Sequence, residues 1–248
     1  RDPLTTYATN VIGTAHVLDA VRCAPAQVRV VISVTSDKCY ENREREAGYR
    51  EDEPLGGRDP YSSSKACAEL VTAAYRDSYF TAVDGPRIAS ARAGNVIGGG
   101  DFGEDRLVPD LVRGALAGVT VAVRRPDAVR PWQHVLSPLS GYLQLAQALW
   151  DDPAHATAYN LGPADEDARP VAVLAERFAS RWPGGMRWEP APGPHPHEAT
   201  VLRLDSSRAR TRLGWRPQWG LDTAVDATVD WHVRVRDGEA AAAATREQ

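Results

Sequence analysis

The chain has 248 residues, of which 43% are hydrophobic and 25% charged, as in an ordinary globular protein with a substantial core. Its formal net charge of −4 gives no general attraction to nucleic acid or to anionic membranes, and its apolar runs are too short to span a bilayer. We therefore expect neither nucleic acid nor a membrane as a partner. The three cysteines (Cys23, Cys39 and Cys67) suggest neither a disulfide framework nor a zinc site, so we expect a cytoplasmic protein.

Helical and strand patterns alternate along the chain. Apolar residues recur at helical spacing, and the β-branched runs between them are typical of strands buried on both faces. In chain order we expect a helix at 5–22, a strand at 27–37, a long loop at 41–60, a helix from Tyr61 to about Phe80, and strands at 87–96 and 155–162. This alternation predicts an α/β fold with a doubly wound parallel sheet, whose ligands bind beyond the carboxyl ends of the strands.

The chain is expected to divide into two parts. Residues 1–103, with 134–162 returning to them, predict the C-terminal part of a Rossmann-type domain. Residues 104–133 and 163–235 have shorter elements and predict a smaller substrate-binding lobe. The low-complexity tail, 236–248, is expected to be disordered.

Lysine is almost absent from the chain. Of the 29 Lys and Arg residues, only Lys38 and Lys65 are lysines. Arginine keeps its proton at any working pH, whereas a lysine in suitable surroundings titrates near ~7–8. We therefore ask what these two positions need that arginine cannot provide.

Both lysines lie next to residues that can carry acid–base chemistry. Tyr61 and Lys65 are four residues apart near the start of a helix, so both lie on one helical face, and a nearby cation favours the phenolate of Tyr61. Lys38 follows Ser36 and Asp37 at the end of a strand. A surface ion pair with Asp37 or Glu41 remains the alternative explanation for Lys38.

A strand that ends in serine, a Y-x-x-x-K pair and a strand that ends in R-x-G-N resemble the extended short-chain dehydrogenase/reductase family of nucleotide-sugar enzymes. Within it, TSDKCYEN, GYREDEPLGGRDPYSSSKACAEL, RAGNVIGGGDF, RLVPDLVR and RPWQHVLSPLSGYL are similar to nucleotide-sugar 4,6-dehydratases over about residues 3–232. The resemblance implies NAD as cofactor, CDP-glucose as substrate, and a homodimer packed through helices 5–22 and 61–80. It also implies a lyase reaction: oxidation at C4, loss of water across C5 and C6, and hydride return at C6.

The resemblance also assigns roles to matching residues. Catalysis is implied for Tyr61 (base at O4), Lys65 (acidifies Tyr61 and holds the nicotinamide ribose), Ser36 (hydrogen bond to the same hydroxyl), Asp37 (acid at C6) and Lys38 (base at C5). Cofactor binding is implied for Asn10, Thr35, Tyr61, Lys65 and Arg92. Substrate binding is implied for Asn95, Leu107, Val108, Pro109, Arg130 and His197.

Several alternatives remain open. A mid-helix Asn10 can simply bond a carbonyl, and Arg130 can cap a sheet edge. The HPHE motif at 195–198 lacks the further ligands of a tetrahedral site, so no metal is expected. A nucleotide-sugar epimerase or reductase of the same superfamily is a second interpretation; Asp37 and Lys38 argue against it, since an epimerase needs no acid–base pair at C6. The third reading is an inactive fragment or a binding subunit.

A glycine-rich dinucleotide fingerprint after a first strand does not occur in this sequence. Gly98–Gly100 follows a late strand and lacks the required spacing. The sequence starts without methionine, next to a helix, so we expect it to begin after three β–α units, roughly 90 residues at ~30 each. We therefore expect the chain alone to expose an apolar sheet edge and not to turn over.

Overall fold

The computed structural model describes residues 2–193 and 199–248, which form two compact units. Unit 1 comprises Arg1–Gly94, Pro138–Gly162 and Arg203–Arg216, and unit 2 comprises Asn95–Ser137, Pro163–Leu202 and Pro217–Gln248. The first segment of unit 1 therefore ends at Gly94, where the sequence analysis placed a boundary at residue 103, and its second segment begins at Pro138, where the analysis expected 134. Its third segment, Arg203–Arg216, lies in the range that the sequence assigned to the smaller lobe.

Unit 1 is built on a three-stranded parallel sheet in the order β1-β2-β7. Its strands are β1 (Val30–Val34), β2 (Arg87–Ala93) and β7 (Ala158–Leu161). The structure confirms the predicted α/β fold with a Rossmann-type parallel sheet, and β7 confirms the strand expected at 155–162. In the described part of the chain, β1 forms one edge of this sheet.

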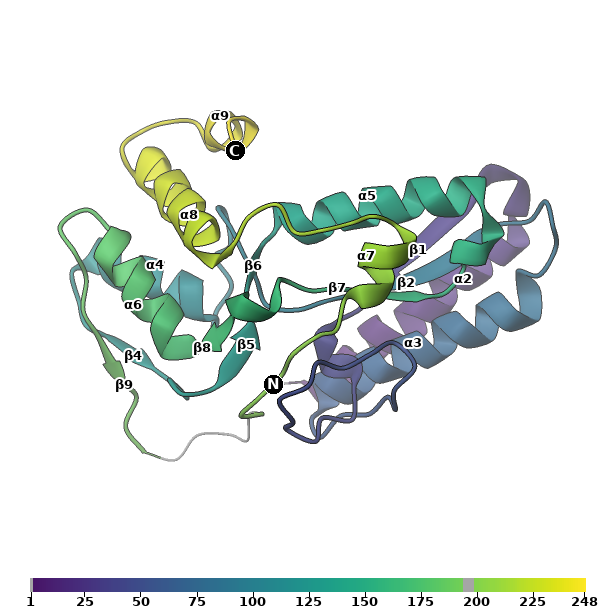
Figure 1. The fold of residues 1–248 in the computed structure, drawn as a ribbon, viewed down its shortest axis with the longest axis horizontal. Helices are drawn as coiled ribbons and strands as arrows, with labels where there is room; N and C mark the ends of the chain where they lie inside the picture. The colour runs from purple at the N-terminus through teal and green to yellow at the C-terminus, as the bar shows by residue number, and fades with distance from the viewer. Residues whose placement is uncertain (1, 194–198) are drawn as a thin grey trace. The chain divides into compact units, whose positions relative to one another are not determined.

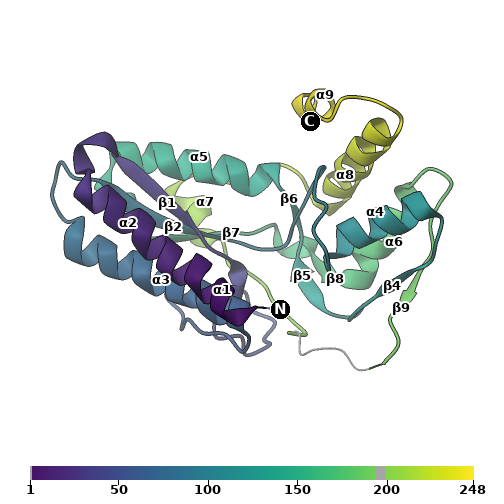
Figure 2. The ribbon, with the colours of Figure 1, turned by 180° about the vertical axis from the view of Figure 1, so that it is seen from behind.

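Helices cover both faces of the sheet (Figures 1 and 2). On one face, α1 (Pro3–Tyr7), a π-helical turn (Ala8–Ile12) and α2 (Gly13–Cys23) run as one continuous helix beside α3 (Pro60–Tyr79). On the other face lies α5 (Leu136–Asp151), with α7 (Ser207–Arg212) near β7. The core on that side is formed by Ala89, Ala91, Leu145, Leu149, Tyr159, Leu161, Ala209 and Trp215.

The predicted long loop occupies residues 41–59 and is fixed by the segment that returns to unit 1. The backbone of Tyr49 donates to the carbonyl of Arg203 at 2.9 Å and accepts from the amide of Asp205 at 3.0 Å. At Gly48, an added Cβ would lie 2.6 Å from the amide nitrogen of Asp205, so this close approach requires glycine. Such long-range contacts explain why residues 203–216 belong to unit 1.

Unit 2 consists of short strand pairs and helices. Two pairs are parallel, β3 (Val96–Ile97) with β6 (Gln133–His134) and β4 (Val121–Val123) with β9 (Trp188–Pro190), and β5 (Val129–Pro131) pairs antiparallel with β8 (Ala168–Pro170). The helices are α4 (Leu107–Ala117), α6 (Val171–Arg181), α8 (Leu221–Arg236) and α9 (Ala241–Arg246). The apolar faces of α4, α6 and α8 form one core with residues of the strands; this core includes Ile97, Leu111, Val123, Leu174, Phe178 and Leu221.

The C-terminal segment, for which the sequence predicted disorder at 236–248, contains a helix, α9 (Ala241–Arg246). Trp231 Nε1 in α8 donates to Thr245 Oγ1 in α9 at 2.8 Å, and Gln248 Nε2 donates to the carbonyl of Ala227 at 2.6 Å. Arg234 pairs with Glu239 at 2.6 Å. Alanine is the best helix former, and these few polar contacts anchor an alanine-rich helix to α8.

No helix within residues 2–193 and 199–248 has the length and apolar character needed to cross a membrane. Over the same ranges, the His, Cys, Asp and Glu side chains form no cluster suited to a metal ion. The HPHE motif, and with it His197, lies outside the described residues.

Candidate active site

The first part of the site follows β1 at the carboxyl end of the sheet. Ser36 Oγ accepts a hydrogen bond from the backbone amide of Lys38 at 3.2 Å and thereby caps the 3-10 turn Asp37–Cys39. The same hydroxyl donates to Asp37 Oδ1 at 3.1 Å. Ser36 and Asp37 are buried, whereas Lys38 is exposed. The turn packs on α3, which carries the second part of the site.

Local signals at the start of α3 fix the position of Tyr61. Asp59 is the N-cap and accepts a hydrogen bond from the amide of Ser62 at 3.0 Å, and Pro60 occupies the first turn. Tyr61 is 43% exposed. The Nζ atoms of Lys38 and Lys65 lie 5.9 Å and 6.0 Å from the centroid of the Tyr61 ring. Both lysines of the chain therefore lie near one exposed tyrosine.

The surroundings of the lysines favour acid–base chemistry at Tyr61. Burial lowers the pKa of Lys65, and the charge of Glu69 opposes this effect. In the described part of the chain, Lys38 forms no ion pair with Glu41, whose carboxylate instead pairs with Arg43 at 3.0 Å. Two cations near a phenol favour its phenolate form, which can accept the proton of an alcohol.

Asn10 lies in the π-helical turn and reaches the start of α3. Its Nδ2 donates to Ser64 Oγ at 2.9 Å, and Ser64 Oγ donates in turn to the carbonyl of Tyr61 at 2.7 Å. The side chain of Asn10 therefore binds the neighbouring helix instead of a carbonyl of its own helix. π-helical turns are rare, and they often occur at functional sites.

Thr35 and Arg92, which the resemblance assigned to the cofactor, face the protein interior. Thr35 Oγ1 donates to Glu69 Oε1. The side chain of Arg92 is 4% exposed; it donates to Glu69 Oε2 at 2.8 Å, to the Tyr40 hydroxyl at 2.8 Å and to the carbonyl of Glu51 at 3.1 Å. The guanidinium group of Arg92 is therefore buried among protein acceptors, and the cofactor roles of Thr35 and Arg92 remain predictions.

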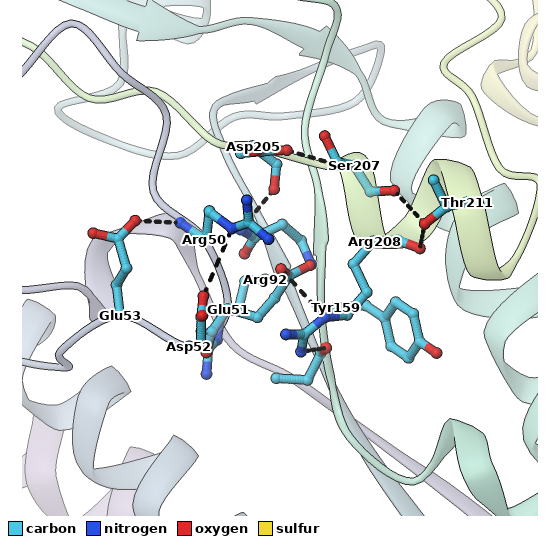
Figure 3. Close-up of polar contacts among 12 residues, drawn as sticks. Arg50, Glu51, Asp52, Glu53, Arg92, Tyr159, Asp205, Ser207, Arg208 and Thr211 are labelled. Carbon is cyan, nitrogen blue, oxygen red and sulfur yellow. Dashed lines mark hydrogen bonds and ion pairs between the residues drawn. The ribbon is translucent and has the colours of Figure 1, made fainter.

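A polar network around Glu51 was not anticipated from the sequence; Figure 3 shows its members Glu51, Arg92 and Arg208. The Tyr40 hydroxyl donates to the side-chain oxygen Oδ1 of Asn160 at 2.6 Å. The backbone amide of Asn160 donates to Glu51 Oε1 at 2.8 Å. Glu51 Oε2 lies 3.5 Å from Nε of Arg208, and burial raises the pKa of Glu51. Arg92 connects this network to Glu69. A signal for Glu69 was present in the sequence, because Glu69 follows Tyr61 and Lys65 at helical spacing.

The expected substrate residues that the structure describes lie in unit 2, and several are buried there. Val108 belongs to the hydrophobic core and Pro109 is buried in α4, and their roles in substrate binding remain predictions. Leu107 packs partly buried against the same core. Arg130 is 6% exposed, and its Nη1 donates to the carbonyl of Val129 at 2.9 Å, which fits the alternative role at a strand.

The roles of Asn95, Leu107 and Arg130 in substrate binding remain predictions. The carbonyl of Asn95 accepts a hydrogen bond from the amide of Gln133 at 3.1 Å, and its side chain is half-buried.

A parallel sheet with helices on both faces, and a tyrosine–lysine pair at the start of α3, define a Rossmann-type protein of the short-chain dehydrogenase/reductase class. The family model described as NAD dependent epimerase/dehydratase family matches residues 1–162. The chain belongs to this family.

Two curated relatives and one solved structure are similar to the chain. The CDP-glucose 4,6-dehydratase of Salmonella typhimurium is 48% identical over 237 residues, which cover 94% of this chain and 66% of the relative. The dTDP-glucose 4,6-dehydratase of Streptomyces griseus is 29% identical over 231 residues, covering 92% of this chain and 65% of the relative. The chain therefore spans slightly less than two thirds of the length of these relatives.

The crystal structure of dTDP-glucose 4,6-dehydratase from Bacillus anthracis, in complex with NAD, matches with a TM-score of 0.77 at 22% identity. The match covers 94% of this chain and 70% of that one. At this level of identity the likeness shows the fold alone.

Proposed function

We propose that the chain is part of an NAD-dependent CDP-glucose 4,6-dehydratase, which converts CDP-D-glucose into CDP-4-keto-6-deoxy-D-glucose. The observation that carries the proposal is the position of Lys38 and Lys65, both about 6 Å from the Tyr61 ring. The 48% identity to a CDP-glucose 4,6-dehydratase supports it. An epimerase needs a base at O4 but no acid–base pair at C6, and the adjacent Asp37 and Lys38 favour the dehydratase. Because the chain covers only part of its relatives, the activity is proposed for a longer protein that contains it.

The residues of unit 1 fit the nicotinamide end of NAD. Tyr61 is exposed, and the ammonium group of Lys65 has no hydrogen bond or ion pair in residues 2–193 and 199–248, so it is available to the hydroxyls of a ribose. NAD held there would supply the hydride acceptor for C4 of the hexose and the hydride donor for C6. The glycine-rich turn that binds a pyrophosphate is not in these 248 residues, and we propose that preceding sequence supplies it.

Each step of the proposed reaction has a candidate residue. Tyr61 removes the proton of the C4 hydroxyl, and Ser36 hydrogen-bonds the same oxygen. Once C4 is a ketone, the hydrogen on C5 becomes acidic and Lys38 removes it as a proton. Asp37 protonates the C6 hydroxyl, the C6–O bond breaks, and water leaves. Lys38 then returns a proton to C5, so the substrate loses one water overall.

The exposure of Lys38 sets a condition on this mechanism. An amine acts as a base only when it is neutral, and removal from water favours its neutral form. The described residues leave Lys38 exposed, so the desolvation must come from the bound substrate and from the rest of the longer protein. Asp37, in contrast, is buried by the chain itself.

We propose a homodimer that forms through the helical face of unit 1. Large apolar side chains are exposed along the continuous helix Pro3–Cys23 and along α3, namely Leu4, Tyr7, Ile12, Val17, Leu70 and Tyr79. A cytoplasmic location is consistent with three free thiols, at Cys23, Cys39 and Cys67. Light scattering on the longer protein should give the mass of a dimer, and an active monomer would contradict the proposal.

The test is turnover of CDP-glucose by the upstream-extended protein and by the 248-residue chain, each with added NAD. The 4-keto product absorbs in base in the near ultraviolet, so its formation is easily followed. We expect product from the extended protein only. Formation of a C4-epimerised sugar without the 4-keto product would favour the epimerase alternative.

Lys38→Arg keeps the charge but removes the titrating amine. In the extended protein we expect dehydration to fall at least ~10²-fold, the scale of a lost acid–base group. Arg43→Lys, at an exposed position in the neighbouring loop, is the matched control and should keep full activity. Near-normal dehydration by Lys38→Arg would refute the assigned role.

A further inference from the structure

Glu69 lies one helical turn beyond Lys65, on the same face of α3 as Tyr61. An acidic residue four positions from a lysine is a natural ion-pair partner for it. In the part of the chain that the structure describes, however, Lys65 and Glu69 form no ion pair, and the ammonium group of Lys65 lies 6.0 Å from the Tyr61 ring centroid. The carboxylate of Glu69 is bound elsewhere.

Glu69 is held by both neighbouring strands. Its side chain is 3% exposed. Oε1 accepts from Thr35 Oγ1, directly after β1, and Oε2 accepts from Ser90 Oγ at 2.7 Å and from Arg92 Nη2 at 2.8 Å in β2. Burial alone would raise the pKa of Glu69, but the hydrogen bond and charge of Arg92 hold it below its usual value. Glu69 is therefore a buried carboxylate whose counter-ion is Arg92.

Arg92 is fixed at its other end. Its Nη1 donates to the Tyr40 hydroxyl at 2.8 Å and to the carbonyl of Glu51 at 3.1 Å, and its guanidinium lies 5.0 Å from the Tyr40 ring centroid. Arginine cannot lose its proton in a protein, so this pairing persists at any working pH. The position of the guanidinium in turn fixes the position of Glu69.

We propose that Arg92 is a positioning residue for the candidate base: it holds Glu69 against β2, so that Lys65 stays directed to Tyr61. This inference rests on the proposed role of Tyr61 and Lys65. Without Arg92, the buried carboxylate would lack a counter-ion, a strongly unfavourable state, and Lys65 is the cation one turn away. A Lys65 drawn to Glu69 would leave Tyr61 with one cation fewer.

The other charged groups near Tyr61 remain constant in this comparison. They are Lys38, whose Nζ lies 5.9 Å from the ring, Asp37 in the same turn, and Asp59 at the N-cap of α3. Substitutions at positions 69 and 92 alter none of them.

The two lysines make a direct test possible. With lysine labelled at Cε by carbon-13, the 248-residue chain gives two lysine side-chain signals in an NMR spectrum. The signal that disappears in Lys38→Arg belongs to Lys38, and the other belongs to Lys65. The pKa of Lys65 is then measured without substrate in the wild type, in Arg92→Met and in Arg92→Met/Glu69→Gln. The 248-residue chain and the upstream-extended protein are both titrated, and circular dichroism checks that each variant folds.

We expect Arg92→Met to raise the pKa of Lys65 by about 1 unit, the effect of an opposite charge at close range. The additional Glu69→Gln should remove that increase. An unchanged pKa in Arg92→Met, or an increase that persists in the double variant, would overturn the proposal. If Arg92→Met does not fold, Glu69→Gln alone decides, because loss of the anion should lower the pKa of Lys65, and no change would refute the coupling.

A second measurement distinguishes positioning from a purely structural role. In the extended protein, the acidic limb of kcat/KM against pH should move to higher pH in Arg92→Met and return in the double variant. A structural defect would reduce activity at all pH values without that movement. Because the lysine titration needs no turnover, failure of the proposed dehydratase activity would leave it interpretable.

Discussion

Acidification should destabilise unit 2 through one buried histidine. His134 in β6 is 0% exposed, and its ring centroid lies 4.7 Å from that of Trp219. In residues 2–193 and 199–248, its Nε2 has no hydrogen-bond partner. Burial lowers the pKa of His134 to about 4 from an ordinary value of 6.5. Between these two pH values, the unfolded chain binds a proton that the folded chain does not.

The sign and size of the effect follow from this difference. Stability rises with pH wherever the unfolded state binds more protons, so the contribution is complete above pH 6.5 and is lost as the pH falls towards 4. Each unit of pKa corresponds to about 1.4 kcal/mol, which gives a loss of ~3 kcal/mol over the whole interval. His232 in α8 is also buried with a lowered pKa, and it adds a slope of the same sign.

The assay is urea unfolding at several pH values between 4.5 and 7.5, followed by tryptophan fluorescence. His134→Gln cannot take up the proton, so its free energy of unfolding should fall less steeply with acidification than that of the wild type. His16→Gln, at an exposed position of α2, is the matched control and should keep the wild-type slope. Equal slopes for His134→Gln and the wild type would refute the reasoning.

Three further outcomes are expected from thermal unfolding and fluorescence. An added Cβ at Gly99 would overlap the Trp231 ring, so Gly99→Ala should lower the free energy of unfolding by about 1–3 kcal/mol; an unchanged value would contradict this packing. At Gly13, which is helical, an added Cβ would lie 3.8 Å from its nearest neighbour, the carbonyl oxygen of Ala8. Gly13→Ala should therefore raise the free energy of unfolding by roughly 0.5–1 kcal/mol, and a decrease would show that the site is less open. Deletion of residues 241–248 removes the hydrogen bond between Thr245 and Trp231, so the tryptophan emission should shift to the red and the Tm should fall. Identical emission spectra would show that α9 does not cover the indole of Trp231.

Local signals predicted the parts of the site that lie close together in the sequence. Asp59 and Pro60 mark the start of α3, and helical spacing brings Lys65 near Tyr61. The scarcity of lysine also singled out Lys38, which the structure places near the same ring. The fold class followed from the alternation of helical and strand patterns.

Long-range partners could not be predicted in this way. Arg92 resembles a ligand-binding residue in its motif, and only the positions of Glu69 and Tyr40 reveal that it faces inward. The helix in the tail was missed because its anchor, Trp231, lies 14 residues from Thr245 and composition does not report such contacts. The sequence did not reveal the burial of Val108, because that burial depends on α6 and α8, which follow much later in the chain.

The π-helical turn Ala8–Ile12 has a consequence for how this site could arise during evolution. Such a turn contains one residue more than the α-helical turn it replaces, and each residue rotates the following side chains by about 100° around the axis. Deleting Val11 would restore an uninterrupted α-helix and preserve the packing of α2, but it would turn Asn10 away from Ser64. A single inserted codon is therefore enough to turn the first part of the helix, with Asn10, towards Ser64 while α2 stays in place.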